Sequence, residues 1–463
     1  MKTSRSGWVV LAVGLMVAVP PLARAVAVTN TGKTGGQAPS EDLQTHLRGL
    51  AAAAPAERAS AACELGLRGV DAAPAIPALV RLLADEARVE GVDCDEASWG
   101  SPGPTIGGEP TVCLTSPARE TARALARIGA PAIEPLRTAL GDAQPITRRY
   151  AAAALGLVDD GTLVRPAVDD LVGASDDAEW QVRRSVVWAL GRIGDAGNLD
   201  PIVKRLQDEH PRVREAAAHS LGEIEDARAI AALGSALADT DWAVRREAAH
   251  ALGEIEDAAA IEHLSRALDD QHARVRETAV WALGQIEDRR AVPPLSEALK
   301  DPDPDVRRQA AWALGQVEDP SAVEALSGAL QDSSSRVREQ EAWALGQIED
   351  PRAVSALSGA LKNPDAGVRR QAAWALGQIE DPAAVEPLSA ALRDNDREVR
   401  RQAAWALGQI EDRRAAPALS EALKDADAEV RRQTAWALGQ IEDPGAVPAL
   451  SEALKDADIG VRR

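Results

Sequence analysis

Hydrophobic residues recur along the chain with the spacing of a helix that buries one side. A helix turns by about 100° per residue, so apolar residues three, four and seven positions apart share one stripe. In residues 304–334 this stripe consists of Val306, Ala310, Ala313, Leu314 and Val317. The pattern predicts a first helix from about Asp305 to Val317.

A second, shorter stripe follows a break at Pro320. The residue before a proline avoids the helical conformation, which ends the first helix, and Ser321 can cap the next one. The second stripe consists of Ala322, Val323, Leu326, Ala329 and Leu330. Neither helix can bury its stripe alone, so the pattern predicts helix pairs that stack on one another.

The two-helix pattern repeats along most of the chain. Its Leu-Gly pair recurs from Leu190 to Leu438 at every 31st residue, and weaker copies precede it. A strict period of this length is typical of solenoids. We therefore predict an all-α solenoid of about twelve two-helix repeats.

The units read VRRxAAxALGxIxDxxAVxxLxxAL and resemble HEAT repeats, in the short form named after phycobilin (PBS) lyases. The resemblance covers residues 118–458 and, more loosely, 56–85. It implies a right-handed α-α superhelix of the HEAT/armadillo type, in which the first helix of each unit lines the concave surface. The family includes scaffolds, binding proteins and a few enzymes, so the fold does not select a function.

The first segment, residues 1–25, is predicted to be a signal peptide. Lys2 and Arg5 precede an apolar run too short to span a bilayer, and Ala-x-Ala motifs predict cleavage after Ala25 or, alternatively, after Ala27. An uncleaved anchor is the other interpretation. The remaining segments are a flexible linker (26–40), an N-terminal helix and first repeat (41–85), an irregular insertion (86–117), degenerate repeats (118–175), regular repeats (176–458) and the start of a truncated repeat (459–463).

The chain of 463 residues carries a formal net charge of −20. This charge argues against a nucleic-acid binder, which needs positive charge to displace counterions, and against attraction to anionic lipid. We expect no nucleic-acid partner and no membrane insertion after signal cleavage.

Three cysteines fit an exported protein. Cys94 and Cys113 share the irregular insertion, and a disulfide between them would stabilise it by roughly 3 kcal/mol. Cys63 lies in an Ala-rich helical pattern and is predicted to be a free, buried thiol.

One arginine and one aspartate keep their places in the regular units. We expect them to pair between neighbouring units as a ladder, since arginine offers a bidentate fork to a carboxylate. The alternative is an arginine row for a polyanion. The ladder residues are Arg276, Arg307, Arg338, Arg369, Arg400 and Arg431, with Asp288, Asp319, Asp350, Asp381, Asp412 and Asp443.

Tryptophan supplies 11 of the 12 aromatic residues, mostly at one position of the first helix. This position lies about 145° from the centre of the apolar stripe, beside polar residues. Two compatible interpretations remain: the indoles cover the surface between units, or they form a contact surface for a partner. The partner-binding candidates are Trp188, Trp281, Trp312, Trp343, Trp374, Trp405 and Trp436, His219 and His250 at the same position, and Gln316, Gln347, Gln378 and Gln409 one turn later.

The sequence offers no catalytic constellation. His219 and His250 each precede a glutamate by one turn, Glu223 and Glu254, which favours surface ion pairs over metal ligands. Deoxyhypusine hydroxylase is a HEAT-repeat di-iron enzyme with adjacent His-Glu ligands, but the matching positions here hold no His-Glu pair. We expect no catalytic residue, no metal site and no cofactor.

The chain stops inside a unit, after Val461-Arg462-Arg463. The last complete unit resembles an interior one, so either the array continues or a partner or second copy covers its end. The latter case predicts self-association through residues 428–463.

These features predict an exported scaffold, periplasmic or extracellular, that binds a protein or peptide, with a glycan as another possibility, through a Trp-lined concave face. The alternative is a HEAT-repeat enzyme of the phycobilin lyase or deoxyhypusine hydroxylase type.

Overall fold

A computed structural model describes residues 41–90, 114–195, 197 and 199–462. The predicted signal peptide, the linker and most of the insertion lie outside these residues. All structural statements below concern the unit Glu41–Arg463.

The longer helix of each pair has the predicted start and end. In α17 (Pro304–Val317), the N-cap Asp303 accepts from the Asp305 amide, Pro304 occupies the first turn, and Glu318 ends the helix in the left-handed conformation, with φ of 51°. The other first helices are α2 (Pro55–Leu67), α4 (Pro117–Ile128), α6 (Pro145–Gly156), α9 (Trp180–Ile193), α11 (Pro211–Ile224), α13 (Trp242–Glu254), α15 (Ala273–Gln285), α19 (Ser335–Ile348), α21 (Ala366–Ile379), α23 (Arg397–Ile410) and α25 (Ala428–Ile441).

The second helices are shorter. They are α3 (Ile76–Leu82), α5 (Ala130–Ala139), α8 (Val168–Ala174), α10 (Leu199–Arg205), α12 (Ile230–Ala236), α14 (Ile261–Ala267), α16 (Val292–Ala298), α18 (Val323–Ala329), α20 (Val354–Ala360), α22 (Val385–Ala391), α24 (Ala416–Ala422) and α26 (Val447–Ala453). Further helices are α1 (Glu41–Gly49), α7 (Gly161–Val164) and the terminal turn α27 (Ile459–Arg462).

A 3₁₀ turn leads into most second helices. Asp319 caps the turn before α18 by accepting from the Ser321 amide at 2.8 Å. Ser321 was predicted to be the cap; it is the capped residue, because Pro320 opens the turn one residue earlier. These turns are η1 (Gly69–Ala75), η2 (Arg165–Ala167), η4 (Ala227–Ala229), η5 (Ala258–Ala260), η6 (Arg289–Ala291), η7 (Pro320–Ala322), η8 (Pro351–Ala353), η9 (Pro382–Ala384), η10 (Arg413–Ala415) and η11 (Pro444–Ala446).

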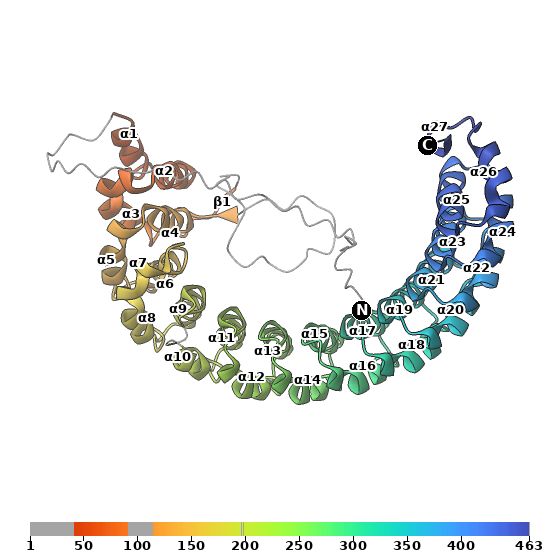
Figure 1. Ribbon diagram of the computed structural model, residues 1–463. Coiled ribbons are helices and arrows are strands. Elements are labelled where there is room, and N and C mark those ends of the chain that lie inside the picture. The colour runs from red at the N-terminus through yellow and green to blue at the C-terminus, as the bar shows by residue number, and fades with distance from the viewer. Residues whose placement is uncertain (1–40, 91–113, 196, 198, 463) are drawn as a thin grey trace, which may run out of the picture. The chain divides into compact units, whose positions relative to one another are not determined.

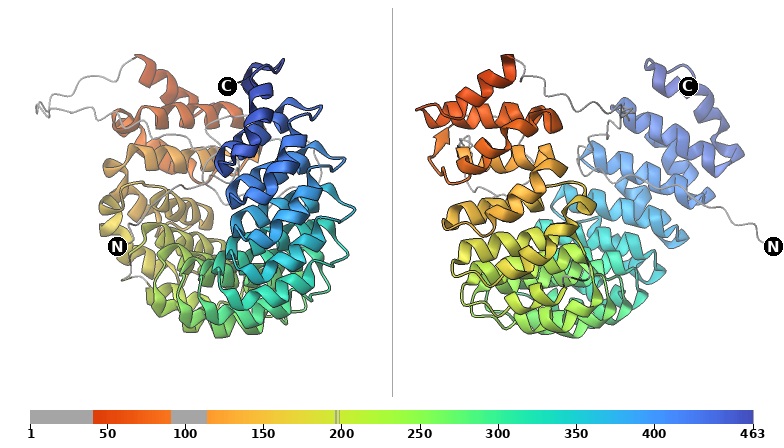
Figure 2. Two further views of the ribbon diagram at one scale, coloured as in Figure 1. Left: turned by 45° about the vertical axis from the view of Figure 1, so that its right-hand side comes forward. Right: turned by 90° about the vertical axis from the view of Figure 1, so that its left-hand side faces the viewer.

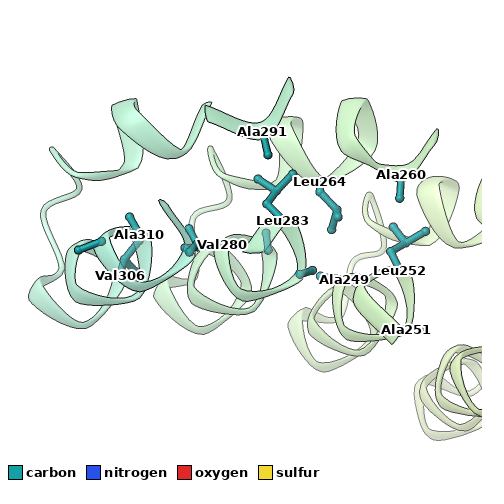
Figure 3. Packing of buried hydrophobic residues seen from close by; sticks show 14 of the residues in the cluster. Ala249, Ala251, Leu252, Ala260, Leu264, Val280, Leu283, Ala291, Val306 and Ala310 are labelled. Atoms are coloured by element: carbon teal, nitrogen blue, oxygen red, sulfur yellow. The ribbon is translucent and has the colours of Figure 1, made fainter. Parts of the chain in front are cut away.

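The helix pairs stack as an α-solenoid, which confirms the predicted fold. The first helices lie along the inner side of the curve and the second helices along the outer side (Figure 1; Figure 2 gives two other views). Ala310 and Leu314 of α17 and Leu326 of α18 are fully buried, as their stripes predicted. Alanine, leucine and valine from successive units fill one continuous core between the two layers (Figure 3).

The described ends of the insertion form two short strands. β1 (Val89–Glu90) pairs antiparallel with β2 (Leu114–Thr115), and Ser116 caps α4, which starts at Pro117. These short strands are the exception to the predicted all-α fold among the described residues.

The prediction of a free Cys63 is wrong, because Cys63 is disulfide-bonded. The chain has two other cysteines, Cys94 and Cys113, which both lie outside the described residues. An intrachain bond from Cys63 uses one of them, so the predicted Cys94–Cys113 bond cannot form at the same time.

We expect peptide mapping of the oxidised protein, without reduction, to show the Cys63 peptide joined to a peptide that contains Cys94 or Cys113. A free Cys63 thiol would contradict the structure. Reduction serves as the control, since it should release the Cys63 peptide.

None of the helices that the structure describes is both long enough and apolar enough to cross a bilayer.

Candidate functional site

The tryptophan row follows the first helices and packs between units. The ring of Trp343 lies over Gly315 of the preceding unit, where an added Cβ atom would meet Trp343 Cζ3 at 2.6 Å. The same contact joins Gly284 to Trp312 and Gly346 to Trp374. Only glycine admits so close an approach, which explains why the Leu-Gly pair and the tryptophan repeat together.

The indoles also stay accessible along one edge. Trp312, Trp343, Trp374 and Trp405 are half-buried, whereas Trp436 in the last complete unit is 38% exposed. Gln316, Gln347, Gln378 and Gln409 are half-buried one turn later on the same face. The row therefore packs between units, as the first interpretation expects, and keeps part of each residue accessible on the inner face. The contact surface for a partner stays a prediction.

Histidines replace tryptophan in two adjacent units. His219 Nδ1 lies 2.9 Å from Glu247 Oε1 of the next first helix, whereas its predicted partner Glu223 is 4.0 Å from Nε2. The hydrogen bond to Glu247 raises the pKa of His219. His250 Nδ1 lies 3.4 Å from Glu254 Oε2, and this contact raises the pKa of His250. The main partner of His219 is therefore Glu247 of the next unit, and the predicted partner Glu223 lies farther away.

In the part of the chain that the structure describes, no group of three or more His, Cys, Asp or Glu side chains could hold a metal ion.

A pocket of about 560 Å³ opens between α6, α9 and α11. Trp180, Arg184 and Trp188 follow one another at four-residue intervals on α9 and form one wall. Its other lining residues are Arg149 of α6, Gln181 and Ser185 of α9, Arg212, Glu215, Ala216 and His219 of α11, and Glu247 of α13.

Smaller residues at the tryptophan position leave room for this pocket. Ala153 holds that position in α6 and His219 holds it in α11, on either side of Trp188. Trp180 stacks on His210, the N-cap of α11, with ring centroids 3.8 Å apart. The sequence analysis missed the pocket, although the Trp-Arg-Trp spacing on α9 was a readable signal.

Arg184 is the unusual charge in the pocket. It has no hydrogen-bond or ion-pair partner among the described residues, whereas Arg149 pairs with Glu86 and Arg212 with Glu215, each at 2.8 Å. Burial away from water lowers the pKa of Arg184. The negative charge of Glu215 opposes this effect, whereas the positive charges of Arg149 and Arg212 lower the pKa further. Arg184 is nevertheless exposed, and it lines the pocket. A guanidinium in this setting can bind an anionic ligand by donating hydrogen bonds to it.

The repeat pattern and the stacked pairs agree with the comparison with known families. The profile described as "HEAT repeats" matches overlapping spans from residue 168 to residue 463, and that of the "PBS lyase HEAT-like repeat" matches residues 117–142. The chain belongs to the HEAT-repeat family.

Several solved structures are similar to this chain. Kap95p, from a complex with RanGDP, has a TM-score of 0.56 at 14% identity and covers 89% of this chain and 66% of its own. Human deoxyhypusine hydroxylase is 30% identical over 54% of this chain and 98% of its own, with a TM-score of 0.26. The CpcE–CpcF phycocyanin lyase of Nostoc sp. is 28% identical over 48% of this chain and 92% of its own, with a TM-score of 0.31. No curated protein matches the chain in sequence.

The arginine ladder between HEAT units exists, but its aspartates differ from the predicted ones. Arg307 Nε and Nη2 donate to the carboxylate of Asp332, at 2.6 and 3.0 Å, in the turn before the next first helix. Its Nη1 donates to the carbonyl oxygens of Asp301 and Pro302, in the turn before its own helix. Each ladder arginine therefore ties two successive turns together.

The same geometry recurs with a spacing of 25 residues. The pairs are Arg183–Asp208, Arg214–Asp239, Arg245–Asp270, Arg276–Asp301, Arg307–Asp332, Arg369–Asp394, Arg400–Asp425 and Arg431–Asp456. In one unit the ladder lacks its carboxylate, because Arg338 meets Asn363, at 3.4 Å.

The predicted ladder aspartates have another role. Asp288, Asp319, Asp350, Asp381, Asp412 and Asp443 each cap a 3₁₀ turn by accepting from the amide two residues later. Both aspartate positions are regular in sequence, and only the stacking of the turns selects the one that meets the arginine.

Apolar side chains are exposed in α26 of the last complete HEAT unit and in the turn α27 that follows it. Val447 is 57% exposed, Leu454 66% and Ile459 60%, and α26 contains no buried residue. Self-association through this end stays a prediction.

Proposed function

We propose that this HEAT-repeat chain is an exported scaffold that binds another protein through the inner face of its first helices. The row of half-buried tryptophans along that face carries the proposal. Because the rings are fixed against glycines of the preceding units, they lose little conformational freedom on binding, and indoles contribute strongly to interface energies.

Polar side chains on the same face would supply specificity. Gln316 and Gln347 flank the indoles, and the position one turn before each tryptophan holds either arginine or glutamate, as in Arg308 and Glu339. An extended peptide or a partner helix fits such a mixed surface better than a small substrate does. Enzymatic activity of the lyase or hydroxylase type is the alternative; bound iron, or a bilin adduct formed with an acceptor protein, would favour it.

The test places bulk and charge on one face at a time. The inner-face variant carries Gln316→Arg, Gln347→Arg and Gln378→Arg. The matched outer-face variant carries Gly328→Arg, Gly359→Arg and Ala390→Arg, at one equivalent position of three second helices. Gly328 and Gly359 have open space around them, and both variants add three positive charges.

We expect immobilised wild-type protein to capture a partner from the exported fraction, the outer-face variant to capture it equally, and the inner-face variant to lose it. Thermal melts check that both variants fold. Equal capture by the two variants would contradict the proposed binding face.

A further inference from the structure

We propose that the pocket between α6, α9 and α11 binds a carboxylate group of a protein partner on the guanidinium of Arg184. The inference rests on the proposed function and adds a recognition site at one end of the tryptophan row.

Arg184 has the donors that such a group needs. A guanidinium presents a planar fork that matches a carboxylate in bidentate geometry. No described side chain occupies the fork of Arg184, although the ladder engages the preceding Arg183 with Asp208 at 2.7 and 2.8 Å. Two adjacent arginines on one helix are thus used differently: Arg183 holds the fold, and Arg184 faces the pocket.

The neighbouring charges define where an anion can lie. Arg149 and Arg212 both act on Arg184 from α6 and α11, so an anion among these three groups would relieve their mutual repulsion. Glu215 and Glu247 line the side toward α11 and α13 and repel a second negative charge there. The arrangement favours a single carboxylate, with a hydrogen-bond donor such as a peptide N–H toward the glutamates.

The walls select a peptide over a free ion. Trp180 and Trp188 bracket Arg184 on α9, and Trp180 is held by its stack on His210. Their apolar surfaces can cover the aliphatic part of an acidic side chain or of a C-terminal residue. A volume of about 560 Å³ accommodates a few residues of an extended chain. The net charge of −20 gives no general attraction for anions, so recognition must be local.

Short peptides test the site in the full-length protein by calorimetry. One peptide is acetylated trialanyl-glutamate with an amidated end, which offers a side-chain carboxylate. A second is acetylated tetra-alanine with a free C-terminus, and a third is its neutral amide. Inorganic phosphate is the fourth probe. We expect at least one carboxylate peptide to bind and the neutral amide not to bind.

Three variants locate the binding. Arg184→Gln should weaken carboxylate binding by about tenfold or more, and Arg184→Lys should weaken it less, because it keeps the charge but loses the fork. Arg393→Gln is the matched control, since Arg393 lies in the turn after α22 of the outer layer, away from the pocket, and is also exposed. It should bind as the wild type does. Arg184 makes no hydrogen bond to a described residue, so its replacement should leave the thermal melt unchanged.

The proposal is overturned if neither carboxylate peptide binds, if phosphate binds and carboxylate does not, or if Arg184→Gln binds as the wild type does. Its failure is separable from failure of the scaffold function. Loss of partner capture by the inner-face variant, together with absent peptide binding, would keep the binding face and reject this pocket. If a carboxylate peptide binds but the inner-face variant still captures the partner, the pocket is kept and the proposed binding face is rejected.

Discussion

Arg307→Ala should lower the free energy of unfolding of its HEAT units by about 3 kcal/mol, whereas Arg308→Ala should change it by less than about 0.5 kcal/mol. Arg307 and Asp332 expose only 13% and 11% of their side chains, so the substitution leaves a largely buried carboxylate without its partner. It also removes the donor to the carbonyl oxygens of Asp301 and Pro302. Arg308 lies 3.8 Å from an exposed Asp305, a pair that water screens.

Denaturant unfolding of both variants measures this difference, and hydrogen exchange in α17 and α19 shows whether the loss is local, as expected for a solenoid. Arg338→Ala provides an internal control. Arg338 keeps the contacts with the carbonyl oxygens of its own turn, Asp332 and Ser333, but it meets the neutral amide of Asn363 in place of a carboxylate. Its removal should therefore cost less than that of Arg307. Equal, small effects of Arg307→Ala and Arg308→Ala would reject the ladder as a source of stability.

Glu341→Ala should stabilise the protein, by about 3 kcal/mol at pH 7. Glu341 is fully buried, and neither of its carboxylate oxygens has a hydrogen-bond partner among the described residues. Neighbouring units hold Ala310 and Ala372 at this position, and Thr434 holds it in a later unit with its hydroxyl bonded to the Val430 carbonyl oxygen. Alanine is therefore compatible with the local packing.

The effect should depend on pH in one direction. Burial, with a smaller contribution from Asp332, raises the pKa of Glu341 from its ordinary value of 4.5 to about 9. Below pH 4.5 the side chain is protonated in both the folded and the unfolded chain, so the carboxyl adds no charge penalty. As the pH rises from about 4.5 to about 9, the unfolded chain gains by ionising while the folded chain stays protonated. Stability is therefore lost across this range.

Unfolding free energies of wild type and Glu341→Ala at several values between pH 5 and pH 9 measure the difference, which should widen as the pH rises. The raised pKa values of His219 and His250 affect both proteins equally and cancel in the difference. Glu324→Ala, which removes an exposed glutamate from α18, is the control and should run parallel to wild type. A constant difference between wild type and Glu341→Ala would contradict the assignment.

The helices and the core stripes were predictable because they depend on local spacing. The apolar positions of α17 fix which side of the helix is buried, whatever the helix packs against. The same periodicity placed Trp312 off the stripe. Its contact with Gly284 of the preceding unit could not be predicted from angle alone, since it depends on the distance between stacked helices.

By itself, the sequence determined the 31-residue period, the pairing of a long helix with a short one, and which side of each helix in the interior units faces the core. Only the tertiary structure decided that Arg307 pairs with Asp332 and not Asp319, that Cys63 forms a disulfide, and that Arg184 lines a pocket. Helix formation and burial follow from residues within one or two turns of each other. The aspartate that pairs with each arginine depends on how the turns of successive units stack. Asp319 and Asp332 both belong to regular repeats in the sequence, and only the stacking places Asp332 beside Arg307.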